Sequence, residues 1–505
     1  MKKLILVLLV ILFFSSSYAQ ERDENTSTLS ISGAITYERP VLNKNHIGLN
    51  YNNTEKKPAR QIVVHLINED EDTIAITTTD DNGKYNFPYI SKNIQLKIRV
   101  YALMSNTESN SWDIKVLDNT KNDALYAIEG ELSSTKESDN QRNLHIPLKN
   151  KSSAPFSILD DIYTSMKKIT AIEPTTFPSL KIYWSTRNNP SNGSFKEGQI
   201  GTSFFDGDES IYFLGNDASD ADEFDTHVIV HEWSHYFEHY FSRTDNIGGI
   251  HGDGDYLDIR VAFSEGFGNA WSAIVTDNPI YSDTVKENGW FMNIERDISI
   301  NPGWWSEFSV QKIIYDLYDD IGDINESNES HDHISLGFKP IYDVLTTTQK
   351  ETKAFTSIFS FITLLKENNS SLDSKIDMLV QNENIDSIET IYGESQHNLY
   401  SNLGEQEVCT SSQYGKVNKF LNHKFIRFSI DTQKRYTIRV KQTNGSDSDP
   451  DFSLYGGTPF RLRKVVESYQ HGLETSRIFF TVGDYILDIS DYNNLEEACF
   501  DISIK

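Results

Sequence analysis

Two histidines separated by three residues give the sequence its clearest chemical signal, in His231-Glu232-Trp233-Ser234-His235. On a helix, residues four positions apart lie one turn apart on the same face, so both imidazoles can reach one zinc ion. Glu232 projects beside them and can accept a proton from a water molecule that the zinc activates. We therefore predict that His231 and His235 are zinc ligands and that Glu232 is a general base.

A carboxylate thirty positions after His235 can complete the metal site. Glu265 follows the apolar run Val261-Ala262-Phe263, where an unpaired buried charge would be costly and a metal ion would remove that cost. A catalytic zinc takes three protein ligands and keeps one open position, so Glu265 is predicted as the third ligand. Asn269 lies four residues further along the same helix face and could accept the N–H of a ligand histidine, which would hold the tautomer of that ring.

This pattern, HExxH followed by Glu-x-x-x-Asn on a second helix, resembles that of the gluzincins, the thermolysin-like zinc metallopeptidases, over residues 180–275. The resemblance implies that the two histidines and Glu265 hold Zn2+ and that Glu232 is the base for attack of water on a peptide carbonyl. Asn269 stands where thermolysin-type enzymes carry an aspartate. We therefore expect a zinc-dependent peptidase whose substrates are proteins or peptides.

Two other interpretations stay open at this point. His235-Tyr236-Phe237-Glu238-His239 also matches HxxEH, the inverzincin order, in which Glu238 would be the base. That interpretation leaves Glu265 unexplained, and His227 and His239 are otherwise expected on the helix surface. The second alternative is an extracellular binding or adhesion protein in which the zinc site is structural or degenerate.

Gluzincins also place a tyrosine or a histidine beside the zinc to stabilise the oxyanion. Tyr256, between the two ligand segments, and His331 and His333, further along the chain, are the candidates. The sequence does not choose among them.

Several runs of aspartate suggest a structural Ca2+ ion in addition to zinc, because calcium prefers carboxylate oxygens. None of these runs has the spacing of an EF-hand loop. An acidic loop without an ion is the competing interpretation. The aspartates concerned are Asp217, Asp220, Asp222, Asp225, Asp253, Asp255, Asp258, Asp447, Asp449 and Asp451.

The metal-binding residues need two helices to hold them, and the sequence predicts both. Asp225 can cap a helix that carries the two histidines, and a second helix is expected over residues 258–275. An earlier helix is predicted from Pro155, because apolar residues recur every three to four positions up to Ile169. Just before the histidine helix, the turn at 206–209 predicts a hairpin whose edge strand could pair with an extended substrate.

Strand-like segments dominate on both sides of this region. From residue 28 to 148 apolar and polar residues alternate, Asn82-Gly83 predicts a hairpin turn, and the stretch 58–85 resembles the transthyretin-like accessory modules of secreted enzymes. Short β-rich segments over residues 406–505 resemble the bacterial pre-peptidase C-terminal domain. The expected fold class is therefore multidomain, with an α+β zincin-like catalytic domain at residues 154–404 flanked by two small β-sandwiches.

The first residues predict export. A positive start, the apolar run Leu4–Phe14 and small residues at the two positions that a signal peptidase reads, Ser17 and Ala19, have the form of a signal peptide at residues 1–19. We therefore expect a secreted, extracellular protein, with the periplasm as the alternative compartment. In an oxidising compartment the only two cysteines, Cys409 and Cys499, are predicted to form a disulfide bond.

The charge balance excludes some partners. The chain has 74 Asp and Glu against 46 Lys and Arg, a formal net charge of −28. Such an acidic surface disfavours nucleic acid and anionic membranes. The apolar run of the predicted signal is too short to span a bilayer, and no other stretch reaches the length of a membrane-spanning helix. We expect a monomer without a nucleic-acid partner or a membrane span.

Overall fold

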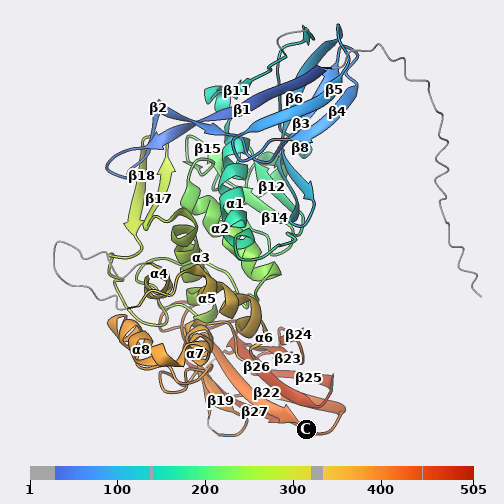
Figure 1. The fold of residues 1–505 in the computed structure, drawn as a ribbon. Coiled ribbons are helices and arrows are strands. Elements are labelled where there is room, and N and C mark those ends of the chain that lie inside the picture. The colour runs from blue at the N-terminus through green and yellow to red at the C-terminus, as the bar shows by residue number, and fades with distance from the viewer. Residues whose placement is uncertain (1–28, 137–139, 320–333, 406, 446) are drawn as a thin grey trace, which may run out of the picture.

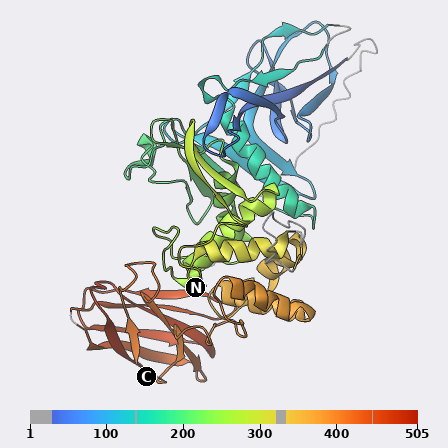
Figure 2. The same ribbon diagram turned by 90° about the vertical axis from the view of Figure 1, so that its left-hand side faces the viewer.

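The computed structural model describes residues 29–136, 140–319, 334–405, 407–445 and 447–505. The predicted signal peptide at residues 1–19 and the candidate histidines His331 and His333 lie outside the described residues. The described chain forms three tiers: strands at the N-terminal end, helices in the middle and a second group of strands at the C-terminal end (Figure 1; Figure 2).

The first fourteen strands build the N-terminal tier and the start of the middle one. They are β1 (Leu29–Leu42), β2 (Leu49–Pro58), β3 (Ile62–Asn68), β4 (Thr73–Thr78), β5 (Lys84–Ile90), β6 (Gln95–Thr107), β7 (Ser111–Asp118), β8 (Ala124–Leu125), β9 (Ala127–Glu129), β10 (Ser133–Ser134), β11 (Leu144–Ile146), β12 (Leu180–Trp184), β13 (Phe204–Phe205) and β14 (Ser210–Phe213). One sheet has the order β11-β1-β2, with β5 also paired to β1. The other has ten strands, with the main order β13-β14-β12-β7-β6-β3-β4.

The expected fold class, an α+β zincin-like catalytic domain flanked by two small β-sandwiches, is wrong. Strands account for 37% of the structure and helices for 23%, and the described residues show no clear α+β core of the expected kind. β12 pairs in parallel with β7, with Ile182 opposite Val116, so strands from both sides of residue 150 share one sheet. Alternating apolar residues predicted these strands, but alternation carries no information about a strand's partner. The boundaries 28–148, 154–404 and 406–505 remain predictions.

The predicted hairpin at Asn82-Gly83 is also wrong. A turn does form there, with Gly83 at φ 70°, but the strands on its two sides pair elsewhere. β4 pairs with β3, with Thr78 opposite Val63, whereas β5 pairs with β1, with Tyr85 opposite Gly33. The turn therefore carries the chain from one sheet to the other. By contrast, β13 and β14 do form the hairpin predicted around residues 206–209.

Helices dominate the middle tier, together with two short strand pairs. The elements are α1 (Ala154–Thr170), β15 (Gly215–Asn216), β16 (Asp220–Ala221), α2 (Thr226–Tyr240), α3 (Ile259–Thr276), β17 (Ile280–Val285), β18 (Asn288–Asn293), α4 (Glu307–Tyr318), α5 (Phe338–Asp343), α6 (Gln349–Glu351), α7 (Ile358–Asn368) and α8 (Asp373–Asn382). The three helices predicted from Pro155, around the two histidines and over residues 258–275 are confirmed as α1, α2 and α3.

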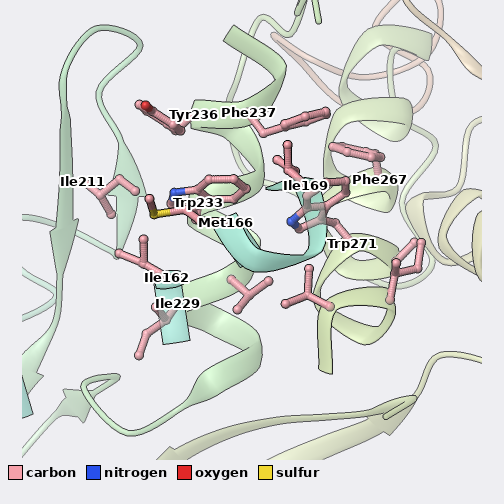
Figure 3. Packing of buried hydrophobic residues seen from close by; sticks show 14 of the residues in the cluster. Ile162, Met166, Ile169, Ile211, Ile229, Trp233, Tyr236, Phe237, Phe267 and Trp271 are labelled. Carbon is pink, nitrogen blue, oxygen red and sulfur yellow. The ribbon is translucent and has the colours of Figure 1, made fainter. Parts of the chain in front are cut away.

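An aromatic core joins α1, α2 and α3, the helices around the predicted metal site (Figure 3). The ring of Trp271 on α3 lies 4.5 Å from Phe237 and 6.1 Å from Trp233, both on α2. Met166 and Ile169 of α1 belong to the same buried cluster. Removing one such indole from a core costs about 3–5 kcal/mol. The core therefore fixes α2 and α3 relative to each other.

Two sheets with a shared hydrophobic core form the C-terminal tier. Their strands are β19 (Tyr400–Asn402), β20 (Val408–Thr410), β21 (His423–Ile430), β22 (Lys434–Asn444), β23 (Pro450–Gly456), β24 (Arg461–Val466), β25 (Leu473–Phe480), β26 (Gly483–Asp491) and β27 (Ala498–Ile504). The orders are β19-β21-β26-β23-β24 and β20-β27-β22-β25. The predicted disulfide is confirmed: Cys409 and Cys499 are bonded directly across β20 and β27. None of the helices in the described part of the chain combines the length and apolar character that crossing a membrane requires.

Candidate metal centre

Three potential ligand atoms form a small triangle where α2 faces α3. His231 Nε2 lies 3.2 Å from His235 Nε2 and 3.2 Å from Glu265 Oε2, and His235 Nε2 lies 3.4 Å from Glu265 Oε2. Tetrahedral zinc with ligand bonds of about 2.0–2.1 Å holds its donor atoms about 3.3–3.4 Å apart. The donor types and their spacing therefore fit one zinc ion, and three protein donors leave one of the four positions open.

Two glycines that follow Glu265 on α3, Gly266 and Gly268, let the neighbouring helices approach. A Cβ atom added at Gly268 would lie 2.8 Å from His231 Cε1 and 2.9 Å from its Nδ1. One added at Gly266 would lie 2.6 Å from the carbonyl oxygen of Glu307, at the start of α4. Because these contacts are shorter than side chains tolerate, only glycine allows the ligand histidine and the ligand glutamate to meet.

Both histidines are oriented by an acceptor on the side of the ring away from the triangle. Asn269 Oδ1 accepts a hydrogen bond from His231 Nδ1–H across 2.8 Å. Glu238 Oε2 lies 3.3 Å from His235 Nδ1 and accepts that N–H. Each bond fixes the ring tautomer and leaves the Nε2 lone pair facing the triangle, as a metal ligand requires.

Glu265 is held in a similar way. Asn246, in the loop between α2 and α3, donates from Nδ2 to Glu265 Oε1 across 2.9 Å, which leaves Oε2 to the triangle. Burial disfavours the charged form of Glu265, but the adjacent His235 and His231 outweigh it and hold the pKa of the carboxyl well below its ordinary value. The carboxylate is therefore charged and aimed, as a ligand to a cation must be.

Glu232 lies next to His231 on α2, half-buried, in the wall of the same cavity as the three ligand residues. Burial raises the pKa of its carboxyl above the ordinary value, while the neighbouring histidines act in the opposite direction. This position lets the carboxylate reach a water molecule in the cavity.

Glu238, the base of the alternative HxxEH interpretation, faces away from the cavity. Its side chain is 1% exposed, and Oε2 accepts hydrogen bonds from Ser264 Oγ across 2.6 Å and from His235. His239 is exposed, with its ring 5.7 Å from that of Phe205. The geometry therefore favours Glu232 over Glu238 as the residue that meets water.

Two sequence expectations about α2 differ from the structure. His227, expected on the helix surface, is buried, and its Nε2–H donates to the Asn278 carbonyl oxygen across 3.0 Å. Burial lowers the pKa of His227 to about 4. Asp225 precedes the helix as predicted but does not cap it; its carboxylate instead accepts from the backbone N–H of Thr284 across 2.7 Å.

A cavity of about 790 Å³ opens over the triangle. Phe204 and Phe205 of β13 form part of its wall, and β13 is the end strand of the ten-stranded sheet. An end strand leaves one row of backbone N–H and C=O groups without a strand partner, so an extended peptide can add to it.

His251 is a candidate functional residue that the sequence did not reveal. Its Nδ1–H donates to Glu307 Oε2 across 2.6 Å, and its Nε2 lies 3.4 Å from Glu265 Oε2. Burial opposes the charged form, but the bond to Glu307 and the charge of Glu265 outweigh it and raise the pKa of His251 to about 9. No sequence signal marks the pair, because His251 belongs to no motif and Glu307 lies 56 residues away.

Tyr256, one of the predicted oxyanion candidates, is not brought to the site. Its ring stacks on Trp305 at 5.3 Å and on Tyr414 at 4.3 Å. It is also not among the residues that line the cavity. Among the candidates within the described residues, His251 therefore lies closest to the ligand triangle.

The aspartates predicted as calcium candidates are dispersed. Asp217 forms an ion pair with Lys151, and Asp255 forms one with Lys419. Asp258 caps α3 by accepting from the Arg260 backbone N–H. Calcium at the predicted positions remains a prediction.

Two of these aspartates meet a third that the sequence did not point to. Carboxylate oxygens of Asp220, Asp222 and Asp283 lie within 4.8 Å of one another. All three residues line the cavity that also contains the ligand triangle.

Comparisons with known proteins do not place the chain in a family. No family model matches, and no curated protein does. Among solved structures, the pre-peptidase C-terminal domain of a collagenase from Bacillus anthracis matches with 15% identity and a TM-score of 0.17, covering 21% of this chain and 92% of that one. This is a weak, partial likeness to the kind of domain that residues 406–505 resemble in sequence.

Two further structures match over more of the chain but no more closely. A cycloisomaltooligosaccharide glucanotransferase from Paenibacillus has 7% identity and a TM-score of 0.13, covering 89% of this chain and 68% of that one. A β-glucosidase from Paenibacillus barengoltzii has 10% identity and a TM-score of 0.12, covering 94% and 70%. Likenesses at this level carry no argument about activity.

Proposed function

We propose that this protein is a zinc-dependent peptidase of the gluzincin type, with His231, His235 and Glu265 as ligands and Glu232 as the general base. The observation that supports the proposal most is the ligand triangle, whose sides of 3.2–3.4 Å suit tetrahedral zinc. The three side chains lie in the wall of a cavity with an available strand edge. The predicted export signal makes a secreted location part of the same proposal.

The chain's own residues supply proton transfer and substrate alignment. When bound, zinc would polarise the scissile carbonyl and lower the pKa of a water molecule toward neutrality. Glu232 takes the proton as the water oxygen attacks the carbonyl carbon, and returns it to the amide nitrogen as the C–N bond breaks. The products are a carboxylic acid and an amine. β13 would hold the substrate backbone extended during this step.

His251 would stabilise the charge that develops on the carbonyl oxygen. Glu307 accepts from the Nδ1–H of His251 and, together with Glu265, favours the charged ring, whose Nε2–H then lies beside the ligand triangle in the cavity. A fixed donor of this kind is already oriented before the reaction starts and so requires no reorganisation.

The decisive experiment compares Glu232→Gln with Glu238→Gln in the full chain. Bound zinc is measured by atomic absorption, and cleavage by mass spectrometry of a peptide-library digest before and after chelation. Glu232→Gln should keep one zinc per chain and lose about 10²–10⁴-fold in kcat. Glu238→Gln, which weakens the hold on His235, should instead lower zinc affinity by about 10–100-fold.

The same measurements can refute the proposal. If Glu238→Gln alone abolished kcat with zinc retained, the base would be misassigned. If wild-type protein bound one zinc and cleaved no peptide in the library, the alternative of an extracellular binding protein with a structural zinc would replace the proposal.

A further inference from the structure

Three aspartates form a second polar group in the wall of the cavity. Asp220 and Asp222 come from β16 and the residue after it, and Asp283 comes from β17. Their carboxylate oxygens lie within 4.8 Å of one another. In the described residues, no ion pair with lysine or arginine joins any of the three. We call this group the acidic recess.

Asp222 has one carboxylate oxygen without a hydrogen-bond partner among the described residues. The residue is 3% exposed, and the unpartnered oxygen is Oδ1. Its other oxygen, Oδ2, accepts from Ser203 Oγ. A buried carboxylate oxygen left unpaired is unfavourable, and the Asp222 carboxylate also lies near those of Asp220 and Asp283. Together these two facts indicate a ligand that brings positive charge.

The recess lies close to the ligand triangle. Val228, which also lines the cavity, is one helical turn before His231 on α2. The Tyr281 ring lies 6.4 Å from the His231 ring. Burial and then the negative charges of Asp283, Glu232 and Asp222 hold the pKa of Tyr281 well above its ordinary value. Tyr281 therefore stands near both groups.

We propose that the acidic recess binds the side chain of a lysine or arginine in the substrate, beside the peptide bond that the metal centre would cleave. This inference rests on the proposed peptidase function and adds its substrate class: proteins or peptides with a basic residue next to the scissile bond.

The walls of the recess suit a long basic side chain better than a metal ion. Leu214, Val228 and Met292 line the same cavity, and the Tyr281 and Trp290 rings stack there at 5.7 Å. Apolar walls accommodate the methylene stem of lysine or arginine, and aromatic faces attract its charge. A calcium ion would gain nothing from these walls.

The number of available oxygens leads to the same choice. Asp222 Oδ2 is engaged by Ser203, and Asp220 Oδ1 accepts from the Ala221 N–H across 3.0 Å. The Trp290 side chain also donates a hydrogen bond to Asp283. Three of the six carboxylate oxygens therefore remain, whereas calcium takes roughly six to eight oxygen ligands. An ammonium group has three N–H donors and a guanidinium group has five.

The charge of the recess also fits a monovalent cation. Burial, together with the neighbouring carboxylates, raises the pKa of Asp222 well above its ordinary value and that of Asp283 to about 6. Raised pKa values mean that three full negative charges are unfavourable in the recess, and a singly charged side chain offsets part of that cost.

The test measures binding without cleavage. Zinc-loaded full-length protein carrying Glu232→Gln is titrated, by fluorescence anisotropy, with pairs of peptides that differ only by lysine or norleucine at one scanned position. Lysine should bind at least about tenfold more tightly at one position. Asp222→Asn and Asp283→Asn, each added to this background, should abolish that preference. Asp206→Asn, which changes an aspartate of the same cavity outside the recess, should preserve it.

Each contrary result has its own meaning. Absence of a lysine preference, or a preference that survives both Asp222→Asn and the half-buried Asp283→Asn, overturns the inference. Calcium chloride alone could raise the melting temperature of the protein, and both variants could lose that rise. This result would make the recess a calcium site and would overturn the inference. If wild-type protein cleaved peptides with no basic preference, the peptidase proposal would stand and this one would fall. If lysine-containing peptides bound selectively but wild-type protein cleaved none of them, the lysine-binding recess would stand and the peptidase proposal would fall.

Discussion

Arg260 of α3 donates from Nη1 to Asp488 Oδ2 of β26 across 2.7 Å, and both side chains are buried. Asp258 accepts from the same guanidinium through both of its oxygens, and His423 lies 2.8 Å from Asp488 Oδ1. The helix that carries Glu265 is therefore tied by a buried ion pair to the C-terminal sheets.

Asp488→Ala should destabilise the whole protein, because it leaves part of a buried guanidinium without an acceptor. We expect a loss of about 2–4 kcal/mol in the free energy of unfolding, measured by urea titration of the zinc-loaded chain. Asp484→Ala is the matched control on the same strand: it breaks the exposed pair with Lys353 and should cost at most about 1 kcal/mol. Equal losses in the two variants would contradict a special role for the buried pair.

Acid should remove the contribution of Asp488. Burial opposes its charged form, but Arg260 and His423 outweigh burial and lower the pKa of Asp488 to about 2. Since an unfolded aspartate has a pKa of about 3.9, the stabilisation is present above that pH and is lost as the pH falls toward 2. The difference in unfolding free energy between wild type and Asp488→Asn, followed from pH 5 to pH 2, should therefore shrink with acid. A difference that stayed constant would rule this linkage out.

Gly268→Ala should damage the metal centre while sparing the fold. The new methyl group would meet the His231 ring at 2.8 Å and push α2 and α3 apart. Zinc affinity, measured by competition with a chromophoric chelator, should fall by about 10–100-fold. Gly252→Ala is the control, because a Cβ atom there meets nothing within 4 Å. An unchanged zinc affinity in Gly268→Ala would show that α2 and α3 can move apart without disturbing the ligands, and the prediction would be wrong.

His251→Gln should separate catalysis from metal binding. If His251 stabilises the oxyanion, the variant should keep one zinc per chain and lose about 10²–10³-fold in kcat. Glu307→Gln should show a smaller loss of the same kind, because it affects only the orientation and charge of the ring. Loss of zinc from His251→Gln would instead make His251 a fourth ligand, and the metal a structural one.

The sequence predicted what depends on local periodicity and missed what depends on distant pairing. Apolar positions between Phe156 and Ile169 follow one helix face, and α1 spans them. The three predicted ligands could be grouped because His231 and His235 lie one turn apart on one helix and Glu265 lies on the next helix. His251 and Glu307 could not, since a glycine-rich loop folds back to bring them together. The hairpin predicted at Gly83 was wrong for a similar reason. Local sequence specifies the turn, but the pairing of β4 with β3 and of β5 with β1 depends on distant residues.

The parallel pairing of β12 with β7 limits how the chain can be divided. Leu180 of β12 pairs with Ile114 of β7, and the chain between them, which includes α1, forms the long crossover connection that a parallel pair requires. Closing such a long connection is slow, and an unpaired β12 would expose its backbone to other chains. A fragment that began at α1, the start of the predicted peptidase domain, would leave β12 without β7. We expect such a fragment to aggregate, so the two regions must be expressed together.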